Sequence, residues 1–250
     1  NVSVGFGNNS KVKAWRNVSA RAKSKLDLYS RVQDSGYGLG TNCSATAANT
    51  VTRNVSATVG NGAAITAVVG NIEILSEGDE DSSIESIAKG SSGAAYAGGG
   101  PSANITYTSN VTTTVGGGSD IEAKYGTLDI RSKEAMTMYA YAYRKASAAV
   151  ASNKSTAKIT ATTNVSTKIA ENTTEKARLL GEYTTIGAYI VLQKIHANAI
   201  SYTASAGSKT EAVATSNVNN TLNTKIDNAY VGGIETLTVA ASVDNQNIKS

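Results

Sequence analysis

The stretch NVSATVGNGAAITAVVGNIEILSEG (residues 54–78) decides the fold of this 250-residue chain, because the chain repeats it. NVTTTVGGGSDIEAKYGTLDIRSKE (residues 110–134) is close to it, and NVSVGFGNNSKVKAWRNVSARAKS (residues 1–24) is a looser version. Aligned on the leading asparagine, the phrase starts at intervals of 53 to 56 residues, at Asn1, Asn54, Asn110, Asn164 and Asn217. Self-similarity at a nearly fixed period indicates a repeat architecture.

Each phrase reads as strands joined by tight corners. An apolar residue falls five positions after each asparagine, at Phe6, Val59, Val115, Ile169 and Leu222. The turn-forming segments GNNS, GNGA and GGGS follow it in the first three copies, and glycine and asparagine tolerate the backbone angles that tight corners need. A helix is the alternative for residues 171–180 (ENTTEKARLL), but the other copies hold turns there, so we expect a turn.

Between the phrases the chain alternates with period two, which predicts strands with one buried and one wet face. Three such inward-facing sets are evident, with Asn49 and Arg53 as imperfections in the first: Cys43, Ala45, Ala47, Asn49, Val51, Arg53, Val55, Ala57 and Val59; Ile105, Tyr107, Ser109, Val111, Thr113 and Val115; and Ala157, Ile159, Ala161, Thr163, Val165, Thr167 and Ile169.

Strands and corners at a fixed period predict an all-β fold, a β-solenoid similar to a parallel β-helix. A repeat could form three coils of about 18 residues or one wide coil of about 54. We favour the wide coil, because the long alternating runs lack regular corners. We therefore expect a single domain, residues 1–250, with repeats at approximately 1–53, 54–109, 110–163, 164–216 and 217–250.

The composition fits a narrow core and argues against several other classes. The chain is 40% hydrophobic but only 6% aromatic, and its net charge is +4. No basic block suits a nucleic-acid groove, so we expect no nucleic-acid partner. Cys43 is the only cysteine, which excludes a disulfide framework. No apolar run reaches membrane-spanning length, and residue 1 does not begin a signal peptide, so an exported chain would be a mature form or a fragment.

The repeated phrase resembles a known family. Its pattern of VG, a Gly-Asn or Gly-Gly turn, I-x-A and then G-(N/T)-(I/L)-x-I is similar to repeats of filamentous-haemagglutinin-like and leukotoxin-like bacterial exoproteins, the filamentous adhesins. The resemblance covers residues 54–135 strongly, residues 1–24 fairly and residues beyond 164 loosely. It implies an elongated, exported β-helical shaft at or released from a bacterial surface. The secretion domain expected of that family has no counterpart in this sequence.

Few residues suggest chemistry. The acidic cluster Glu77, Asp79, Glu80, Asp81 and Glu85 could bind Ca²⁺, but it reads better as a solvated turn. His196, the only histidine, belongs to an alternating strand and lacks a G-x-S-x-G partner motif. GGGPS and VGGGSD lack the Lys-Ser/Thr of a phosphate loop and read as corners. We expect no catalytic residue, metal or cofactor.

One aromatic row is the candidate contact surface. Tyr139, Tyr141 and Tyr143 alternate with Met138, Ala140 and Ala142, so all three tyrosines share one face. That face could be exposed and stack against sugars or a neighbouring shaft, or it could cover the sheet internally.

Two further surface patterns are open to interpretation. Asn-x-Ser/Thr sequons are numerous, and they arise either by accident or for a glycan coat. TATTNVST (residues 160–167) hints at an ice-binding threonine lattice, but no Thr-x-Thr ladder is evident across the copies.

We therefore predict a non-enzymatic structural shaft of a secreted or surface filament, with an extracellular or bacterial cell-surface location. Its expected partners are copies of itself, end to end or laterally, because the chain begins and ends in repeat-like sequence, and host-surface or matrix glycans. The alternative is a carbohydrate-binding or polysaccharide-cleaving β-helix, which predicts a cleft with clustered carboxylates.

Overall fold

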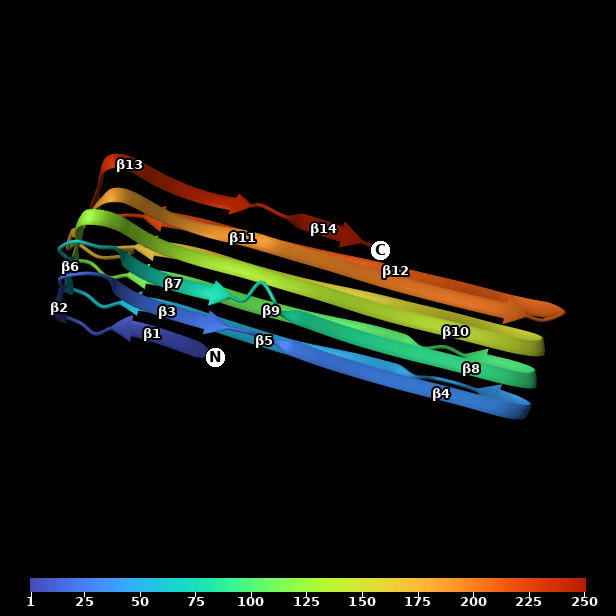
Figure 1. Cartoon of the computed structure of the whole chain (residues 1–250). Helices are drawn as coiled ribbons and strands as arrows, with labels where there is room; N and C mark the ends of the chain where they lie inside the picture. Colours follow the sequence, from blue (N-terminus) through green and yellow to red (C-terminus); the bar gives the residue numbers. More distant parts are fainter.

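A computed structural model describes all 250 residues and is all-β, with 82% of the residues in strands and no helix. The strands are β1 (Val2–Phe6), β2 (Lys11–Ala14), β3 (Val18–Ser24), β4 (Asp27–Asn42), β5 (Thr46–Val59), β6 (Ala64–Ala67), β7 (Ile72–Gly78), β8 (Ser83–Gly99), β9 (Ser102–Val115), β10 (Asp120–Ile169), β11 (Ala177–Ala204), β12 (Gly207–Ile226), β13 (Ala229–Val243) and β14 (Gln246–Lys249). They form one 14-stranded sheet that curls back on itself (Figure 1). None of the elements is a helix long and apolar enough to cross a membrane.

Every strand pairing in the sheet is parallel. On one flank β4 pairs with β8, β8 with the first half of β10, and that half with β11. On the other flank β5 pairs with β9, β9 with the second half of β10, and that half with β12. Paired residues are 52 to 58 positions apart, from Ala177 with Ala229 to Asp120 with Arg178. This spacing matches the wide interval of the sequence repeat and not the interval of about 18 residues.

The predicted inward faces are confirmed. All members of the sets in β9 and in the second half of β10 are buried, as are most members of the set around β5. The segment 171–180 is not a helix: residues 170–176 form an irregular turn and β11 begins at Ala177, as the other copies led us to expect.

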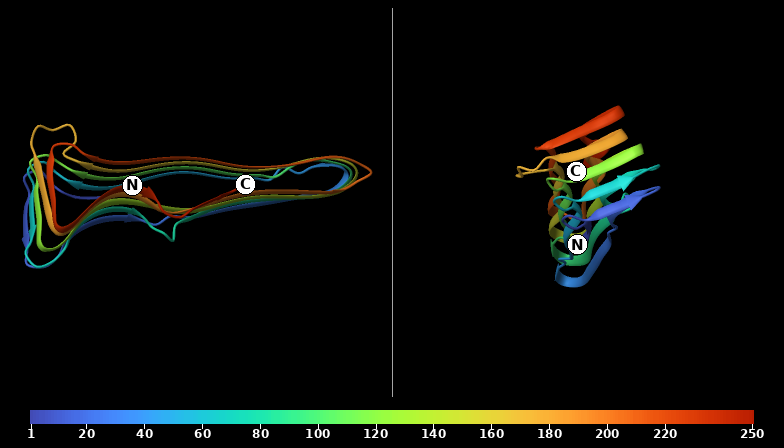
Figure 2. Two further views of the ribbon diagram at one scale, coloured as in Figure 1. Left: turned by 90° about the horizontal axis from the view of Figure 1, so that it is seen from above. Right: turned by 90° about the vertical axis from the view of Figure 1, so that its left-hand side faces the viewer.

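The predicted register of the fifth phrase, which starts at Asn217, is wrong. Asn164 pairs with Thr221 and not with Asn217, and Ile169 pairs with Ile226 and not with Leu222. The reason is the turn before β11, which protrudes from the broad end of the molecule (Figure 2). Seven residues separate β10 from β11, whereas four separate β9 from β10. An alignment at constant spacing therefore slips beyond this turn.

The molecule has a broad end and a narrow arm (Figure 2). At the broad end, where β2 and β6 form a third side, 12 of the 18 clustered core residues are valine, isoleucine or leucine. In the arm, 9 of the 16 clustered core residues are alanine, and the small cluster near the tip is all alanine. Here the two flanks approach each other, and alanines fill most of the narrow space between them together with a few larger side chains such as Tyr107, Met136 and Met138.

Arg53 is not an imperfection of the pattern but part of the core. Its guanidinium forms a buried ion pair with Glu134, donates to the carbonyl of Ala135 (2.9 Å) and donates to the Ser82 hydroxyl (3.1 Å). Glu134 also accepts hydrogen bonds from Tyr107 (3.0 Å) and Ser109 (2.6 Å). Burial lowers the pKa of Arg53, which reflects the cost of removing a charge from water. The network offsets part of that cost.

A second buried arginine lies near the tip of the arm. Arg144 is fully buried, and its side chain donates to Ser92 Oγ (2.9 Å), the Gly98 carbonyl (2.9 Å) and Asn153 Oδ1 (3.2 Å). These acceptors are all neutral. The guanidinium thus ties the bend of β8 to the bend of β10 through the interior.

The outside of the sheet carries an asparagine ladder. The side-chain amide of Asn54 donates to Asn1 Oδ1 (2.8 Å), that of Asn110 to Asn54 Oδ1 (2.8 Å) and that of Asn164 to Asn110 Oδ1 (2.9 Å). The leading residue of the repeated phrase therefore forms a column of hydrogen bonds along the stacking direction, parallel to the backbone bonds.

Candidate functional site

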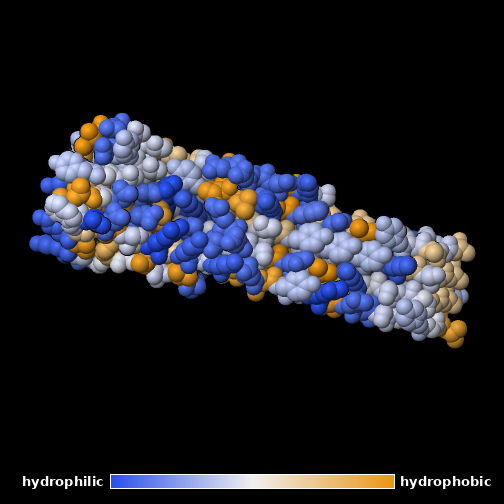
Figure 3. All heavy atoms as spheres, viewed as in Figure 1, coloured by the Kyte–Doolittle hydropathy of each residue, from blue (hydrophilic) through white to orange (hydrophobic).

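The structure places Tyr139, Tyr141 and Tyr143 on the outer surface, so the internal alternative is wrong. Their intervening neighbours Met138, Ala140 and Ala142 are buried in the arm, and the alternation of the strand directs the three tyrosines outward, each half-buried. On this flank, Figure 3 shows aromatic rings that lie flat, side by side, along the course of β10.

The three rings form a floor. The planes of Tyr139 and Tyr141 differ by 9° with centroids 6.0 Å apart, and those of Tyr141 and Tyr143 differ by 17° with centroids 6.2 Å apart. Each of the three side chains is half-buried, so part of each remains accessible to solvent. This regularity follows from the side-chain period of two along a straight strand.

β11 adds a wall along one side of this floor. His196 pairs with Tyr139 in the ladder, and its ring lies 5.4 Å from that of Tyr139 at 64°. Tyr202 lies 5.9 Å from Tyr143 at 58°. We call the five residues Tyr139, Tyr141, Tyr143, His196 and Tyr202 the tyrosine ledge. Sequence reasoning missed the wall, because His196 and Tyr202 are near the floor only through the parallel pairing.

β8 borders the other side with one acid and one base. Glu85 pairs with Tyr139 and Lys89 with Tyr143, and the Lys89 ammonium lies 6.0 Å from the Tyr141 ring centroid. Burial, with a smaller contribution from Glu85, raises the pKa of Tyr139 above its ordinary 10.0. Burial also raises the pKa of Tyr141. Both hydroxyls are therefore protonated at neutral pH and can donate hydrogen bonds.

The acidic cluster is divided between two environments. Glu77 is buried beneath basic partners from β3, with Arg21 and Lys23 in ion-pair range, and Asp79 pairs with Lys23 at 3.1 Å. Glu80 and Asp81 lie in an exposed turn, as predicted, and Glu85 belongs to the border of the tyrosine ledge. The structure holds no group of three or more histidine, cysteine or acidic residues that could bind a metal ion.

The prediction that no Thr-x-Thr ladder recurs was wrong. Thr50 and Thr52 of β5 lie in register with a Thr-x-Thr pair of β9 and another of β10, and β12 continues both columns with asparagine. The aligned residues are Thr50, Thr106, Thr160 and Asn217 in one column and Thr52, Thr108, Thr162 and Asn219 in the other. The inward residue between the threonines differs each time (Val, Tyr, Ala), which hid the repeat. Lys158 and Lys168 interrupt the same face.

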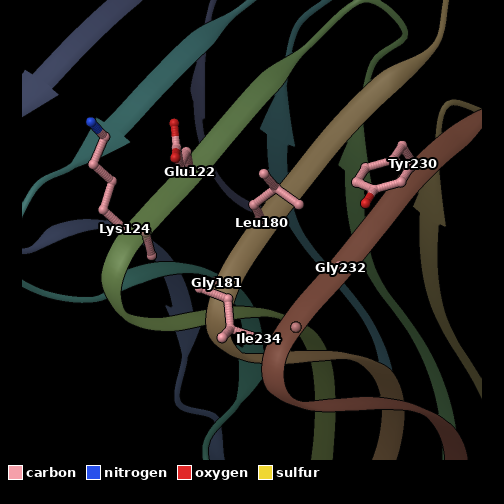
Figure 4. A pocket seen from close by; sticks show the side chains of 9 residues that line it. Glu122, Lys124, Leu180, Gly181, Tyr230, Gly232 and Ile234 are labelled. Carbon is pink, nitrogen blue, oxygen red and sulfur yellow. The ribbon is translucent and has the colours of Figure 1, made fainter.

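A hollow of about 280 Å³ lies where β10, β11 and β13 bend at the broad end (Figure 4). Glycines 181, 232 and 233 form its base, and the side chains of Leu180, Tyr230 and Ile234 flank it. Tyr230 and Ile234 are largely exposed, so the hollow is open to solvent. Glycine at the bends leaves space where other strands carry side chains.

Comparison of the chain with family models, with curated proteins and with solved structures found no match.

Proposed function

We propose that the chain is a β-solenoid with repeats of roughly 54 residues, about five in number, and that it serves as the non-enzymatic shaft of a secreted or surface filament or adhesin. One observation carries the proposal: consecutive phrases lie in parallel register, so that Val2, Val55, Val111, Val165 and Leu222 form one column. Like side chains stacked on like give a rod whose length grows with the number of repeats.

The stiffness of such a shaft has a physical basis in this chain. Of 166 backbone hydrogen bonds, 143 lie within the strand ladders, and in a parallel stack these bonds point along the stacking axis. The asparagine ladder adds side-chain bonds in the same direction. Bending the rod would stretch bonds on one flank and compress those on the other.

Edge strands support self-association. β4 pairs only with β8 and β12 only with β10, so each has one unpaired backbone edge within this structure. Unpaired edges template the addition of another strand. A second copy stacked end to end would satisfy them and extend the shaft into a fibre.

The location at a bacterial surface, and the adhesin role, rest on the resemblance of the repeated phrase to filamentous-haemagglutinin-like and leukotoxin-like exoproteins. A shaft with these properties would hold other parts of an exoprotein at a distance from the cell.

Electron microscopy and fibre diffraction test the proposal. Negatively stained material should show straight rods, and oriented samples should diffract at about 4.8 Å along the rod axis, the spacing of stacked strands. Size-exclusion chromatography with light scattering should show masses in multiples of 25.6 kDa that rise with concentration. Globular particles without the axial reflection would refute the shaft, whereas isolated short rods at every concentration would refute only the stacking.

A further inference from the structure

The floor of the tyrosine ledge suits a partner that presents flat faces in a row. The planes of neighbouring rings are within 9° and 17° of parallel, their centroids are 6.0 and 6.2 Å apart, and the three side chains are half-buried on the outer surface (Figure 3). Aromatic faces bind flat apolar surfaces or polarised C–H groups. Other tyrosines of this chain are more exposed, but the aromatic ring contacts of the structure all lie within the ledge, and a contiguous surface patch marks an interaction site better than scattered single residues do.

The shape of the ledge argues against a small cation. His196 and Tyr202 rise at 64° and 58° from the floor on the β11 side only, and the β8 side is bordered by Glu85 and Lys89. Cages for quaternary ammonium groups enclose the ligand with several rings. Here the floor is long and open at both ends along β10, which fits a chain that lies across the shaft.

The charges argue against a nucleic acid. Single-stranded nucleic acids need a positively charged groove beside their stacking platform. Glu85 lies in register directly below Tyr139, where a phosphate backbone would meet a carboxylate, although Lys89 borders the other end of the floor. Lys145 is the next outward residue along β10 and pairs with Tyr202. Lys194 precedes His196 on the outward face of β11, and Lys249 of β14 pairs with His196. These four bases are spread over four strands and Glu85 interrupts them beside Tyr139, so they do not form a continuous basic track.

We propose that the tyrosine ledge binds an uncharged, extended polysaccharide with β-linked pyranose units. Such chains are flat ribbons with apolar C–H faces and hydroxyls along their edges. The C–H faces would rest on Tyr139, Tyr141 and Tyr143, while His196 and Asn198 on one side and Glu85 and Lys89 on the other meet the hydroxyls. This site does not depend on the proposed assembly of the shaft, since every residue belongs to one chain.

Affinity electrophoresis of the full chain through native gels tests the site, with hydroxyethyl cellulose and xyloglucan as neutral probes and heparin as the charged one. We expect retardation by at least one neutral probe. The triple variant Tyr139→Thr, Tyr141→Thr, Tyr143→Thr should lose about tenfold or more in affinity. Threonine suits the outward face of a strand, so the fold should persist. A Tyr141→Phe variant keeps the ring and should retain most of the binding.

The matched control replaces three exposed tyrosines outside the ledge, Tyr37, Tyr96 and Tyr125, with threonine and should bind like the unmodified chain. Circular dichroism of all variants checks the fold, and if the triple variant unfolds, the single Tyr141→Thr variant replaces it. Retardation by heparin alone, retardation by no probe, or equal loss in the control and ledge variants would overturn the proposal. A failure of the shaft to form fibres would leave this result unaffected.

Discussion

The broad end and the narrow arm both enclose a core between strands of one sheet, but they fill it with different side chains. At the broad end three sides enclose a core of isoleucine, leucine and valine, as in an ordinary globular domain. In the arm two flanks face each other across a core in which alanine is the commonest residue, and this core also holds buried charged groups, the Arg53–Glu134 network and Arg144. The difference indicates that the broad end is stabilised mainly by apolar burial, and that the arm depends on satisfied polar groups in a confined space.

The largest expected effect is in the arm. Glu134→Ala removes the partner of a buried arginine and should lower the free energy of unfolding by about 3–5 kcal/mol, because an uncompensated charge remains inside. Urea denaturation followed by circular dichroism measures it. The double variant Arg53→Met, Glu134→Leu should recover most of the loss, since both charges are then absent. Glu85→Ala on the outer face is the control, and a loss for Glu134→Ala no larger than for this control would contradict the role of the network.

The broad end should respond to lost volume. Ile130→Ala creates a cavity at a fully buried site and should cost about 2–5 kcal/mol in urea denaturation. The surface change Val69→Ala, at a side chain that is 45% exposed, should cost far less. Similar losses for the two variants would mean that the broad end is not a close-packed core.

The arm should instead respond to added volume. Ala140→Leu inserts a larger side chain between the two flanks and should cost about 1–3 kcal/mol through strain. Ala48→Leu, an exposed position on β5, controls for the change in residue type. Thermal denaturation of both proteins measures the difference. An unchanged melting temperature for Ala140→Leu would show that the core of the arm is not close-packed around this residue.

The smallest effect concerns charge at the turns of the broad end. Hydrogen bonds from Lys168 and then Lys225 lower the pKa of Glu171 below its ordinary 4.5. The folded state therefore binds this proton less readily than the unfolded state, so the stabilisation is present above about pH 4.5 and is lost as the pH falls through the lower, folded pKa. An NMR titration of the Glu171 carboxyl checks the direction, and a pKa at or above 4.5 would contradict it. Because the site is exposed, high salt should weaken the effect.

The features of the fold that depend on the local sequence pattern could be predicted from the sequence. Alternation alone identified the inward face of β9 and of the second half of β10, and the spacing of the phrases anticipated which strands pair. It failed where the outcome depends on contacts between distant residues. In the sequence, Arg53 interrupts the apolar alternation. Its burial is explained only by the structure, in which it pairs with Glu134, 81 residues away. The fifth phrase slipped because the length of the turn before β11 does not follow the repeat.

The candidate site was predicted in part for the same reason. The tyrosines of β10 share a face by periodicity, but whether that face is inside or outside depends on what the flanks enclose. His196 and Tyr202 reach the ledge only through the register between β10 and β11. The threonine columns were not predicted because the threonines repeat at alternate positions, while the inward residue between them differs from strand to strand.

The asparagine ladder limits where sugars can be attached to the chain itself. Asn1, Asn54, Asn110 and Asn164 all begin Asn-x-Ser/Thr sequences, and three of the four side-chain amides already donate to the rung below. Adjacent rungs are only about 4.8 Å apart, too close for a bulky N-linked oligosaccharide on each. N-linked glycosylation of the folded chain would therefore occur at asparagines in turns, such as Asn172, and the asparagines of the ladder would remain unmodified.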